Sequence, residues 1–400
     1  MADAKDQPRR ALDGVRVLAL ETSLSGPHAT KILADMGAEV IKVERLGTGD
    51  VIRTWDTAVK GLSSGTAWVI AGKRSLAIDL KQQAGLDILK RLASRADVFL
   101  ENFAPGVAAR MGLGADDLTA ANPRLIYCSL SGYGQDGPYR DAKAYDALIQ
   151  GEAGLIATTG YPDAPARVGV SVTDLISSMY AAVGILLALY QREKTGRGQV
   201  IDVSMFESAV AWLGYFPHHY WHKGEEPERL GLRHQYITPY GPYLAGDGKY
   251  VSVACASAAD WEIFCRDVVN RPDLLTDPRF KDTETRRKHR DALDNIIVAL
   301  FKEHPSAVWL KRLEAARLPY GSVNSIAEVL AHPQLAARNM IQEIDSPVGP
   351  VPVLASPLHL SDSPQRLDPV PALGGDNDSI LRELGYSGAE IESLRRASVI

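Results

Sequence analysis

Alternating strand and helix patterns in the first half of the sequence limit its possible folds more than any other feature. Residues 15–20 are mostly apolar, residues 25–36 have a helical pattern with Pro27 near its start, and residues 39–43 (EVIKV) have a second strand pattern after Gly37. Proline near the start of a helix and glycine after its end are common helix boundaries. These residues therefore predict a strand–helix–strand unit.

The same alternation continues along the chain. Further strand patterns lie at residues 96–100, 125–130 and 200–203, and helical patterns lie at residues 85–93 and 116–121. Parallel strands need long crossover connections, which are usually helices, so this order predicts a mostly parallel sheet with helices on its faces. We therefore expect an α/β fold.

Residues 174–194 have a helical pattern that is apolar on nearly all sides, which predicts a buried helix ending before Gly196. The most apolar part, residues 179–190, is shorter than the ~20 residues that cross a bilayer. The polar N-terminus lacks the apolar core of a signal peptide. The sequence thus predicts a chain that is neither secreted nor membrane-spanning.

The second half of the sequence has a different texture. Residues 215–243 are rich in aromatic residues, histidine, glycine and proline without a sustained period, which predicts an irregular connection. A smaller unit is predicted after it, with a strand at 250–255 and helices at 259–269 and from about 283 to 302. Ser387 and Glu390 predict a capping box at the start of a final helix.

Composition excludes several classes of protein. The net charge is −5, and lysines and arginines are scattered, so no nucleic-acid-binding surface is indicated. The cysteines are Cys128, Cys255 and Cys265, an odd number without metal-type spacing. This usage is typical of a reducing compartment and argues against disulfide or metal–cysteine frameworks, so we expect a soluble cytoplasmic protein.

Residues 132–137 (GYGQDG) match the GxGxxG pattern of dinucleotide-binding loops and follow a predicted strand. That function needs a helix to open within the loop, so that its N–H groups reach a pyrophosphate. Pro138 and a mixed segment follow instead. A structural glycine-rich turn is favoured over a nicotinamide or flavin site.

Several histidines lie close together in the sequence, as they do in metal-binding sites, but the neighbouring residues argue against such a site. Prolines and glycines crowd the segment, and no HExxH motif occurs, so a hinge is favoured over a metal site. Serine hydrolase chemistry is unsupported because no GxSxG motif occurs. The residues concerned are His218, His219, His222, Glu225 and Glu226.

Asp174 is the most informative carboxylate because it stands where a short extended run meets the apolar helix. Spacing alone favours a structural helix N-cap, worth ~1 kcal/mol. A helix N-terminus would also lower the pKa of the carboxyl group and keep it ionised. The two roles are compatible, and an ionised carboxylate can act as a nucleophile that forms acyl intermediates.

Nearly the whole chain, from about Leu12 onward, resembles the class III coenzyme A-transferases (the CaiB/BaiF family). The order and spacing of several motifs carry the resemblance. These motifs are VIKVER at 40–45, KRSLAIDLK at 73–81, ENFAPG at 101–106, NPRLIY at 122–127, SGYGQDGP at 131–138, TD at 173–174 and TGRGQ at 195–199.

The resemblance implies a Rossmann-like large domain built from both ends of the chain, with a smaller inserted α+β domain and an interlocked homodimer. The implied division is a large coenzyme A-binding domain at 1–205, a linker at 206–235, a small domain at 236–320, and a return linker with the C-terminal part of the large domain at 321–400. It implies acyl-CoA as substrate, with no metal and no permanently bound cofactor.

The family's nucleophile falls on Asp174, which implies a CoA-transferase that works through an aspartyl anhydride and an aspartyl-CoA thioester. Four cations in the implied coenzyme A site suit its phosphates. The implied contacts are Leu24, Ser25, Arg45, Ile78, Leu80, Lys81, Asn102, Phe103, Arg110, Lys143, Tyr145 and Asp146.

Departures from the formyl-transferring branch bear on the substrate. Thr22 and Leu24 replace a histidine and a glutamine, Asp146 replaces a glutamate, and the tetraglycine loop is missing between Arg229 and Tyr243. These changes argue against formyl or oxalate substrates. The sequence overall most resembles members that use small dicarboxylates, which implies succinyl-CoA as the donor. A second carboxylate would need a cation, for which Arg167, Arg229 and Arg233 are candidates.

Two alternatives stay open at this point. One is an α-methylacyl-CoA racemase, which shares the fold but needs a histidine base where Tyr145 stands, and tyrosine with a pKa near ~10 is a poor base at neutral pH. The other is a non-catalytic coenzyme A-binding protein that has kept the scaffold.

Overall fold

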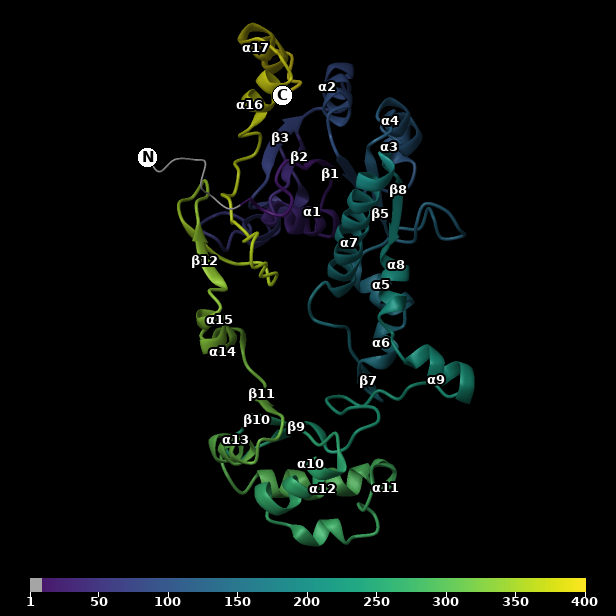
Figure 1. Ribbon diagram of the computed structural model, residues 1–400, viewed down its shortest axis with the longest axis vertical. Coiled ribbons are helices and arrows are strands. Elements are labelled where there is room, and N and C mark those ends of the chain that lie inside the picture. Colours follow the sequence, from purple (N-terminus) through teal and green to yellow (C-terminus); the bar gives the residue numbers. More distant parts are fainter. Residues whose placement is uncertain (1–8) are drawn as a thin grey trace. The chain divides into compact units, whose positions relative to one another are not determined.

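A computed structural model describes residues 9–400 of the chain (Figure 1), which divides into two compact units. The larger unit is built from three segments: the chain up to Leu155, Val168–Gly214 and Gln334–Ile400. The smaller unit contains Ile156–Arg167 and Tyr215–Pro333. The domain boundaries implied by the resemblance stay a prediction.

A six-stranded, fully parallel sheet forms the centre of the larger unit, in the order β3-β2-β1-β4-β5-β8. Every residue of β4 and β5 is buried, as expected of strands covered by helices on both faces. The strands are β1 (Arg16–Leu20), β2 (Glu39–Arg45), β3 (Arg74–Ile78), β4 (Val98–Glu101), β5 (Ile126–Ser131) and β8 (Val200–Ser204). The predicted α/β fold with a parallel sheet is confirmed.

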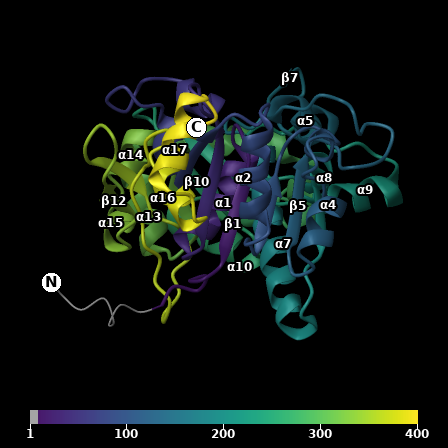
Figure 2. The same ribbon diagram turned by 90° about the horizontal axis from the view of Figure 1, so that it is seen from above.

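Helices cover both faces of this sheet. Helices α2 (Gln83–Ala93), α16 (Asn377–Glu383) and α17 (Gly388–Arg396) pack together on one face, where the C-terminal helices lie beside α2 (Figure 2). The capping box of Ser387 and Glu390 is present at the start of α17. The other face is covered by α1 (Ser25–Asp35), α5 (Asp146–Glu152), α7 (Val172–Thr195) and α8 (Met205–Ala211).

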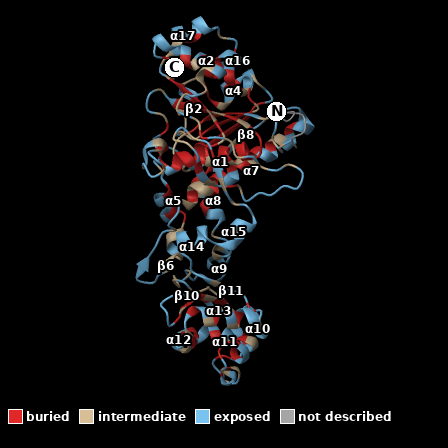
Figure 3. Cartoon of the chain, turned by 90° about the vertical axis from the view of Figure 1, so that its left-hand side faces the viewer, coloured by how far each residue is buried: buried red, intermediate tan, exposed pale blue. Residues whose placement is uncertain are grey.

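Helix α7 differs from its prediction in burial. It packs against α1, β5 and β8, and its left-handed C-cap is Gly196. The helix has both buried and exposed residues (Figure 3). On its exposed face, Leu187 is 62% exposed and Tyr190 is 63% exposed. The expectation of burial on all sides is therefore wrong, because the sheet covers only one face. By length and composition alone α7 could cross a membrane, but its packed face is that of a core helix.

Short elements complete the larger unit. They include one 3₁₀ turn, one π-helical turn and a small antiparallel pair of strands. Their bounds are Val51–Thr54 (3₁₀), Thr66–Ile70 (π), α3 (Val107–Arg110), α4 (Ala115–Ala121), α6 (Leu155–Thr158, whose last three residues belong to the smaller unit), α15 (Pro333–Ala337, whose first residue belongs to the smaller unit), β12 (Ile341–Ile344) and β13 (Val351–Leu354).

The smaller unit has an antiparallel sheet in the order β11-β10-β9 and a core of buried aromatic residues, among them Trp261, Phe264 and Trp309. Two expectations here are wrong. Residues 216–223 are helical, because Pro217 suits a helix start and Gly224 supplies the left-handed cap. The helix predicted at 283–302 is interrupted at His289.

The elements of the smaller unit are β6 (Gly160–Tyr161), β7 (Ala164–Pro165), α9 (Phe216–Lys223), β9 (Tyr240–Leu244), β10 (Tyr250–Ala254), α10 (Ala258–Ile263), a π-helical turn (Phe264–Val268), a 3₁₀ turn (Pro272–Leu275), α11 (Thr283–Lys288), α12 (Arg290–Phe301), α13 (Ser306–Ala315), β11 (Tyr320–Ser322) and α14 (Ile326–Leu330).

Candidate active site

A cavity of about 280 Å³ lies at the carboxyl ends of β1, β4 and β5, within the larger unit. Ligands of open α/β sheets bind at this edge, outside the carboxyl ends of the strands. Asp174, in the first turn of α7, contributes to its lining. Asp174, the most informative carboxylate of the sequence, therefore lies at the edge of the sheet where a ligand is expected.

Asp174 is the third residue of α7 and does not cap it, because Ser171 holds the N-cap position. Its carboxylate is partly buried and receives no hydrogen bond within residues 9–400. Burial, and then the negative charge of Asp146, raise the pKa of Asp174 to about 7. The expected N-cap role and the expected lowering of this pKa are both wrong, since burial outweighs the helix N-terminus here.

Asp146, the first residue of α5, is buried and bonded within the protein. One carboxylate oxygen accepts hydrogen bonds from the backbone N–H and the hydroxyl of Thr173, both at 2.9 Å. The other oxygen accepts a hydrogen bond from Gln150 Nε2 at 2.8 Å. Asp146 thus bonds to the first turn of α7 from a neighbouring helix and holds a negative charge near Asp174.

The first turn of α7 is joined to the loop that enters α1. The Ser178 hydroxyl lies 2.6 Å from the carbonyl oxygens of both Asp174 and Ser25. On the other side of this loop, Asn102 Oδ1 accepts a hydrogen bond from the Thr22 backbone N–H, and its Nδ2 donates to the Thr22 carbonyl, both at 2.9 Å. Segments distant in the sequence are therefore fixed around one cavity.

The residues predicted to contact coenzyme A fall into two groups. The first lines the cavity and comprises Ser25, Asn102, Phe103, Lys143, Tyr145 and Asp146. The second lies outside that lining and comprises Leu24, Arg45, Ile78, Leu80, Lys81 and Arg110.

Members of the second group have distinct environments. Arg45 and Ile78 are partners at the carboxyl ends of β2 and β3, the same edge of the sheet as the cavity, and Lys81 is exposed just beyond them. Arg110 is exposed on α3. The Leu24 side chain is buried with Ile52, Val69 and Ile70.

Sequence reasoning missed Ser23, Ser131 and Met205, which also line the cavity. Ser131 ends β5, so the rule that sites lie at carboxyl ends of parallel strands would have indicated it. Ser23 has a left-handed backbone with φ of 64°, which no local sequence signal announces.

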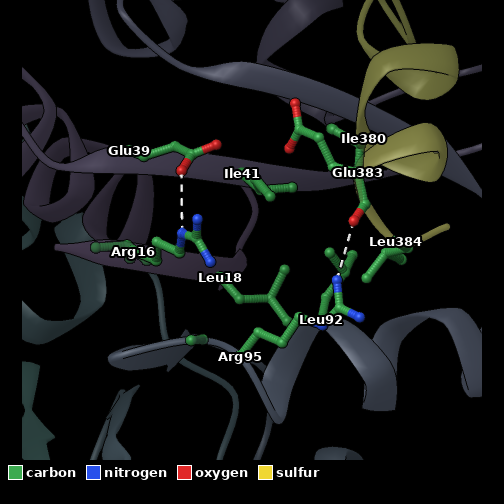
Figure 4. A pocket seen from close by; sticks show the side chains of 11 residues that line it. Arg16, Leu18, Glu39, Ile41, Leu92, Arg95, Ile380, Glu383 and Leu384 are labelled. Carbon is green, nitrogen blue, oxygen red and sulfur yellow. Dashed lines mark hydrogen bonds and ion pairs between the residues drawn. The ribbon is translucent and has the colours of Figure 1, made fainter. Parts of the chain in front are cut away.

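A second cavity, of about 290 Å³, lies at the opposite edge of the sheet between α2 and α16 (Figure 4). Its rim contains the Arg16–Glu39 ion pair at 3.4 Å and a hydrogen bond of 3.0 Å from Arg95 to the Glu383 carbonyl. None of the predicted site residues lines it. We therefore place the candidate active site at Asp174.

The glycine-rich segment and the histidine cluster named in the sequence analysis have surroundings that fit a structural role. No helix opens within residues 132–137, and the next helix begins at Asp146. His219 pairs with Glu225 at 3.5 Å and contacts the Tyr236 hydroxyl at 3.3 Å. Within residues 9–400, no three potential ligands are grouped so as to hold a metal ion.

Two of the cations considered for a second carboxylate are bonded within the smaller unit. Arg229 donates hydrogen bonds to the carbonyl oxygens of Tyr161 and Pro162, at 2.9 and 2.7 Å. Arg233 forms ion pairs with Asp291 and Asp294, at 2.7 and 3.3 Å.

Comparison with known proteins identifies close relatives. A family model described as CoA-transferase family III matches residues 12–377. The chain is 37% identical over 396 residues to succinyl-CoA:glutarate CoA-transferase of Mus musculus, covering 98% of this chain and 90% of that protein. It is 38% identical over 388 residues to acetyl-CoA:oxalate CoA-transferase of Acetobacter aceti, covering 96% and 98%. A crystal structure of a CaiB/BaiF family protein from Brucella suis superposes with a TM-score of 0.84 at 35% identity, covering 94% of this chain and 100% of that one.

Proposed function

The chain belongs to CoA-transferase family III, and from this premise we propose that it moves coenzyme A from an acyl-CoA donor to a small carboxylic acid through covalent intermediates on Asp174. The observation that carries the proposal is the Asp174 carboxylate itself. It lines a cavity at the ligand-binding edge of the sheet and accepts no hydrogen bond from residues 9–400. A carboxylate without a structural partner, in that position, is suited to attack a thioester.

The proposed reaction begins when a carboxylate oxygen of Asp174 attacks the acyl carbon of the donor. The carbon–sulfur bond breaks, which gives an aspartyl mixed anhydride and coenzyme A thiolate. The thiolate then attacks the aspartyl carbonyl carbon, releases the donor acid and leaves an aspartyl-CoA thioester. Backbone N–H groups would stabilise the oxyanion of each tetrahedral intermediate.

The acceptor acid completes the cycle. Its carboxylate attacks the aspartyl thioester and displaces the thiolate, which forms a second mixed anhydride. The thiolate attacks the acceptor's acyl carbon, giving the new acyl-CoA and freeing the Asp174 carboxylate. Thioester energy is conserved in each covalent intermediate, provided that water stays out of the partly buried cavity.

Coenzyme A is proposed to bind along the carboxyl edge of the sheet. Arg45 and Lys81 are exposed there at the ends of β2 and β3, and Lys143 lines the cavity beside Asp174. Phosphates are favourably bound by such cations, and this local set explains how a chain of net charge −5 could hold a polyanion.

The proposed acceptor is a small dicarboxylic acid, with succinyl-CoA as a donor. The relative named for succinyl-CoA and glutarate supports this class. The sequence departures described above argue against oxalate as a substrate. However, a relative named for oxalate is 38% identical to this chain, which argues in the other direction. Oxalate therefore belongs in any panel of acceptor acids, beside succinate, glutarate, mesaconate and itaconate.

We further propose an interlocked homodimer of cytoplasmic protein, with the domain division given by the family resemblance. The exposed apolar face of α7 supports an assembly, because solvent-facing Met179, Val183, Leu186, Leu187 and Tyr190 form a patch along one helix. Patches of this kind commonly mark protein–protein interfaces.

Mass spectrometry of the intact protein, after exposure to a mixture of acyl-CoAs, tests the proposal. We expect an acyl or coenzyme A adduct that maps to Asp174, is removed by hydroxylamine and is absent from Asp174→Asn. Asp116→Asn is the matched control, since Asp116 is an exposed acid in the first turn of another helix, α4. Normal transfer by Asp174→Asn would refute the mechanism, and α-proton exchange without transfer would instead indicate a racemase.

A further inference from the structure

The loop between β1 and α1 forms part of the active-site wall in a strained conformation. Thr22, Ser23 and Ser25 all line the cavity that contains Asp174. Ser23 has a φ of 64°, in the left-handed region that residues with a Cβ atom rarely adopt. Such a conformation persists only where surrounding contacts enforce it. Something must therefore hold this loop.

Asp50 supplies that restraint from the interior of the larger unit. Its Oδ1 accepts hydrogen bonds from the Ser23 backbone N–H at 2.9 Å and from the Thr22 hydroxyl at 3.0 Å. The same oxygen accepts the Ile52 backbone N–H at 3.1 Å, where the 3₁₀ turn begins. One carboxylate oxygen thus joins two successive residues of the cavity wall to a neighbouring segment.

The other oxygen of Asp50 is anchored by a buried ionic network. Lys42 Nζ lies 2.7 Å from Asp50 Oδ2 and 3.4 Å from Glu21, and Lys73 Nζ lies 2.7 Å from Glu21. All four of these side chains have 0% exposure. Because an unpaired charge is very unfavourable in such a place, the two cations and two carboxylates hold one another in position.

The network keeps Asp50 ionised. Burial by itself favours the neutral form, but the charge of Lys42 and the hydrogen bonds from Lys42, Ser23 and Ile52 hold the pKa of Asp50 below its ordinary value. A charged acceptor forms stronger hydrogen bonds with Ser23 and Thr22 than a neutral one would.

We propose that Asp50 is a positioning residue of the active site, which acts through Thr22 and Ser23 to fix the cavity wall around Asp174. The effect reaches the nucleophile because Ser178 bridges the carbonyl oxygens of Ser25 and Asp174. The conformational part of this inference stands on the loop contacts alone, and its catalytic part rests on the proposed function.

The test compares Asp50→Asn with Glu44→Gln. Glu44 is the control because its carboxylate is also fully buried and ion-paired, at 2.7 Å from Arg53, but does not line the cavity. Its Oε1 accepts a hydrogen bond from the Asp50 backbone N–H at 3.2 Å, and the amide oxygen of glutamine can accept the same bond, so Glu44→Gln leaves the Asp50 side chain and its contacts in place. Hydrogen exchange of the peptide spanning residues 20–27 is measured first. We expect about tenfold faster exchange in Asp50→Asn and no change in Glu44→Gln, because local opening depends on local restraints.

The second measurement is the first-turnover rate of adduct formation on Asp174, per folded molecule. We expect Asp50→Asn to lower it about tenfold or more with little change in KM, and Glu44→Gln to retain it even if its melting temperature falls. A merely structural role for Asp50 would lower the melting temperature of both variants and leave the rate per folded molecule unchanged.

The outcomes separate this inference from the proposed function. Unchanged exchange at residues 20–27 in Asp50→Asn overturns the inference, whatever reaction the protein catalyses. Faster exchange with a wild-type rate of acylation overturns its catalytic part. If the wild-type protein forms no adduct, the proposed function fails while the exchange data still decide the loop contact. Asp50→Glu keeps the charge beside Lys42 and yields both measurements if Asp50→Asn does not fold.

Discussion

Replacing Asp174 by asparagine should stabilise the protein while abolishing transfer. Burial and the charge of Asp146 raise the pKa of Asp174 from its ordinary value of 3.8 to about 7. Between these values the folded state keeps a proton that the unfolded chain releases, so stability falls as pH rises through this window. At 1.36 kcal/mol per pKa unit, the full difference corresponds to about 4 kcal/mol above pH 7.

Asp174 is only partly buried, so solvent screening reduces this figure, and we expect Asp174→Asn to be more stable than wild type by about 2 kcal/mol at pH 8. The gain should shrink as pH falls, and it should vanish only below the ordinary pKa of 3.8, where wild-type Asp174 is protonated in both states. Thermal unfolding of both proteins at pH 8 and pH 5 measures the effect, with a shift of several °C expected at pH 8. An Asp174→Asn protein that melts at or below the wild-type temperature at pH 8 would refute the reasoning.

Three further predictions concern the reaction and the assembly. The rate of acylation of Asp174, followed by rapid quench and mass spectrometry, should rise with pH and level off above about 7, since only the carboxylate attacks; a flat profile from pH 5.5 to 8 would contradict this. With ¹⁸O in the acceptor carboxylate, one labelled oxygen should remain on Asp174 and leave with the donor acid of the next cycle, and its absence there would exclude the anhydride route. Leu187→Glu, at a position 62% exposed on α7, should dissociate the proposed homodimer in sedimentation experiments, whereas an unchanged sedimentation coefficient would remove α7 from the interface.

The sequence predicted five of the six strands of the central sheet and missed β3, one of its two edge strands. The five predicted strands lie close to where they were expected, and the signal is strongest for β4 and β5, whose residues are all buried. Strand β3 was missed, since it begins with Arg74 and Ser75. Both polar side chains form tertiary contacts. Arg74 forms ion pairs with Glu39 and Glu383, and the Ser75 hydroxyl forms a hydrogen bond with Glu44. Contacts between distant segments cannot be read from a local pattern.

In the active site, too, some features could be predicted from the sequence, whereas others depend on contacts between distant residues. Asp174 and the two residues that follow β4, Asn102 and Phe103, could be placed near one another from the rule for parallel sheets and from the family resemblance. The restraint on Ser23 could not be found, because Asp50 lies 27 residues along the chain and its role depends on the buried Lys42. Likewise, the composition of α7 predicted burial, but which of its faces meets the sheet depends on packing.

The pKa of Asp174 depends on two opposing effects: the helix N-terminus lowers it, whereas burial and the charge of Asp146 raise it. Only the helix N-terminus could be predicted from the sequence. A helix N-terminus stabilises a nearby carboxylate by ~0.3–1 kcal/mol, and up to ~2 kcal/mol in favourable partly buried geometries. The raised pKa corresponds to about 4 kcal/mol in the opposite direction, to which burial contributes most and the charge of Asp146 contributes next. A more basic carboxylate is also a better nucleophile once ionised, so the same burial that destabilises the folded protein favours attack on a thioester near neutral pH.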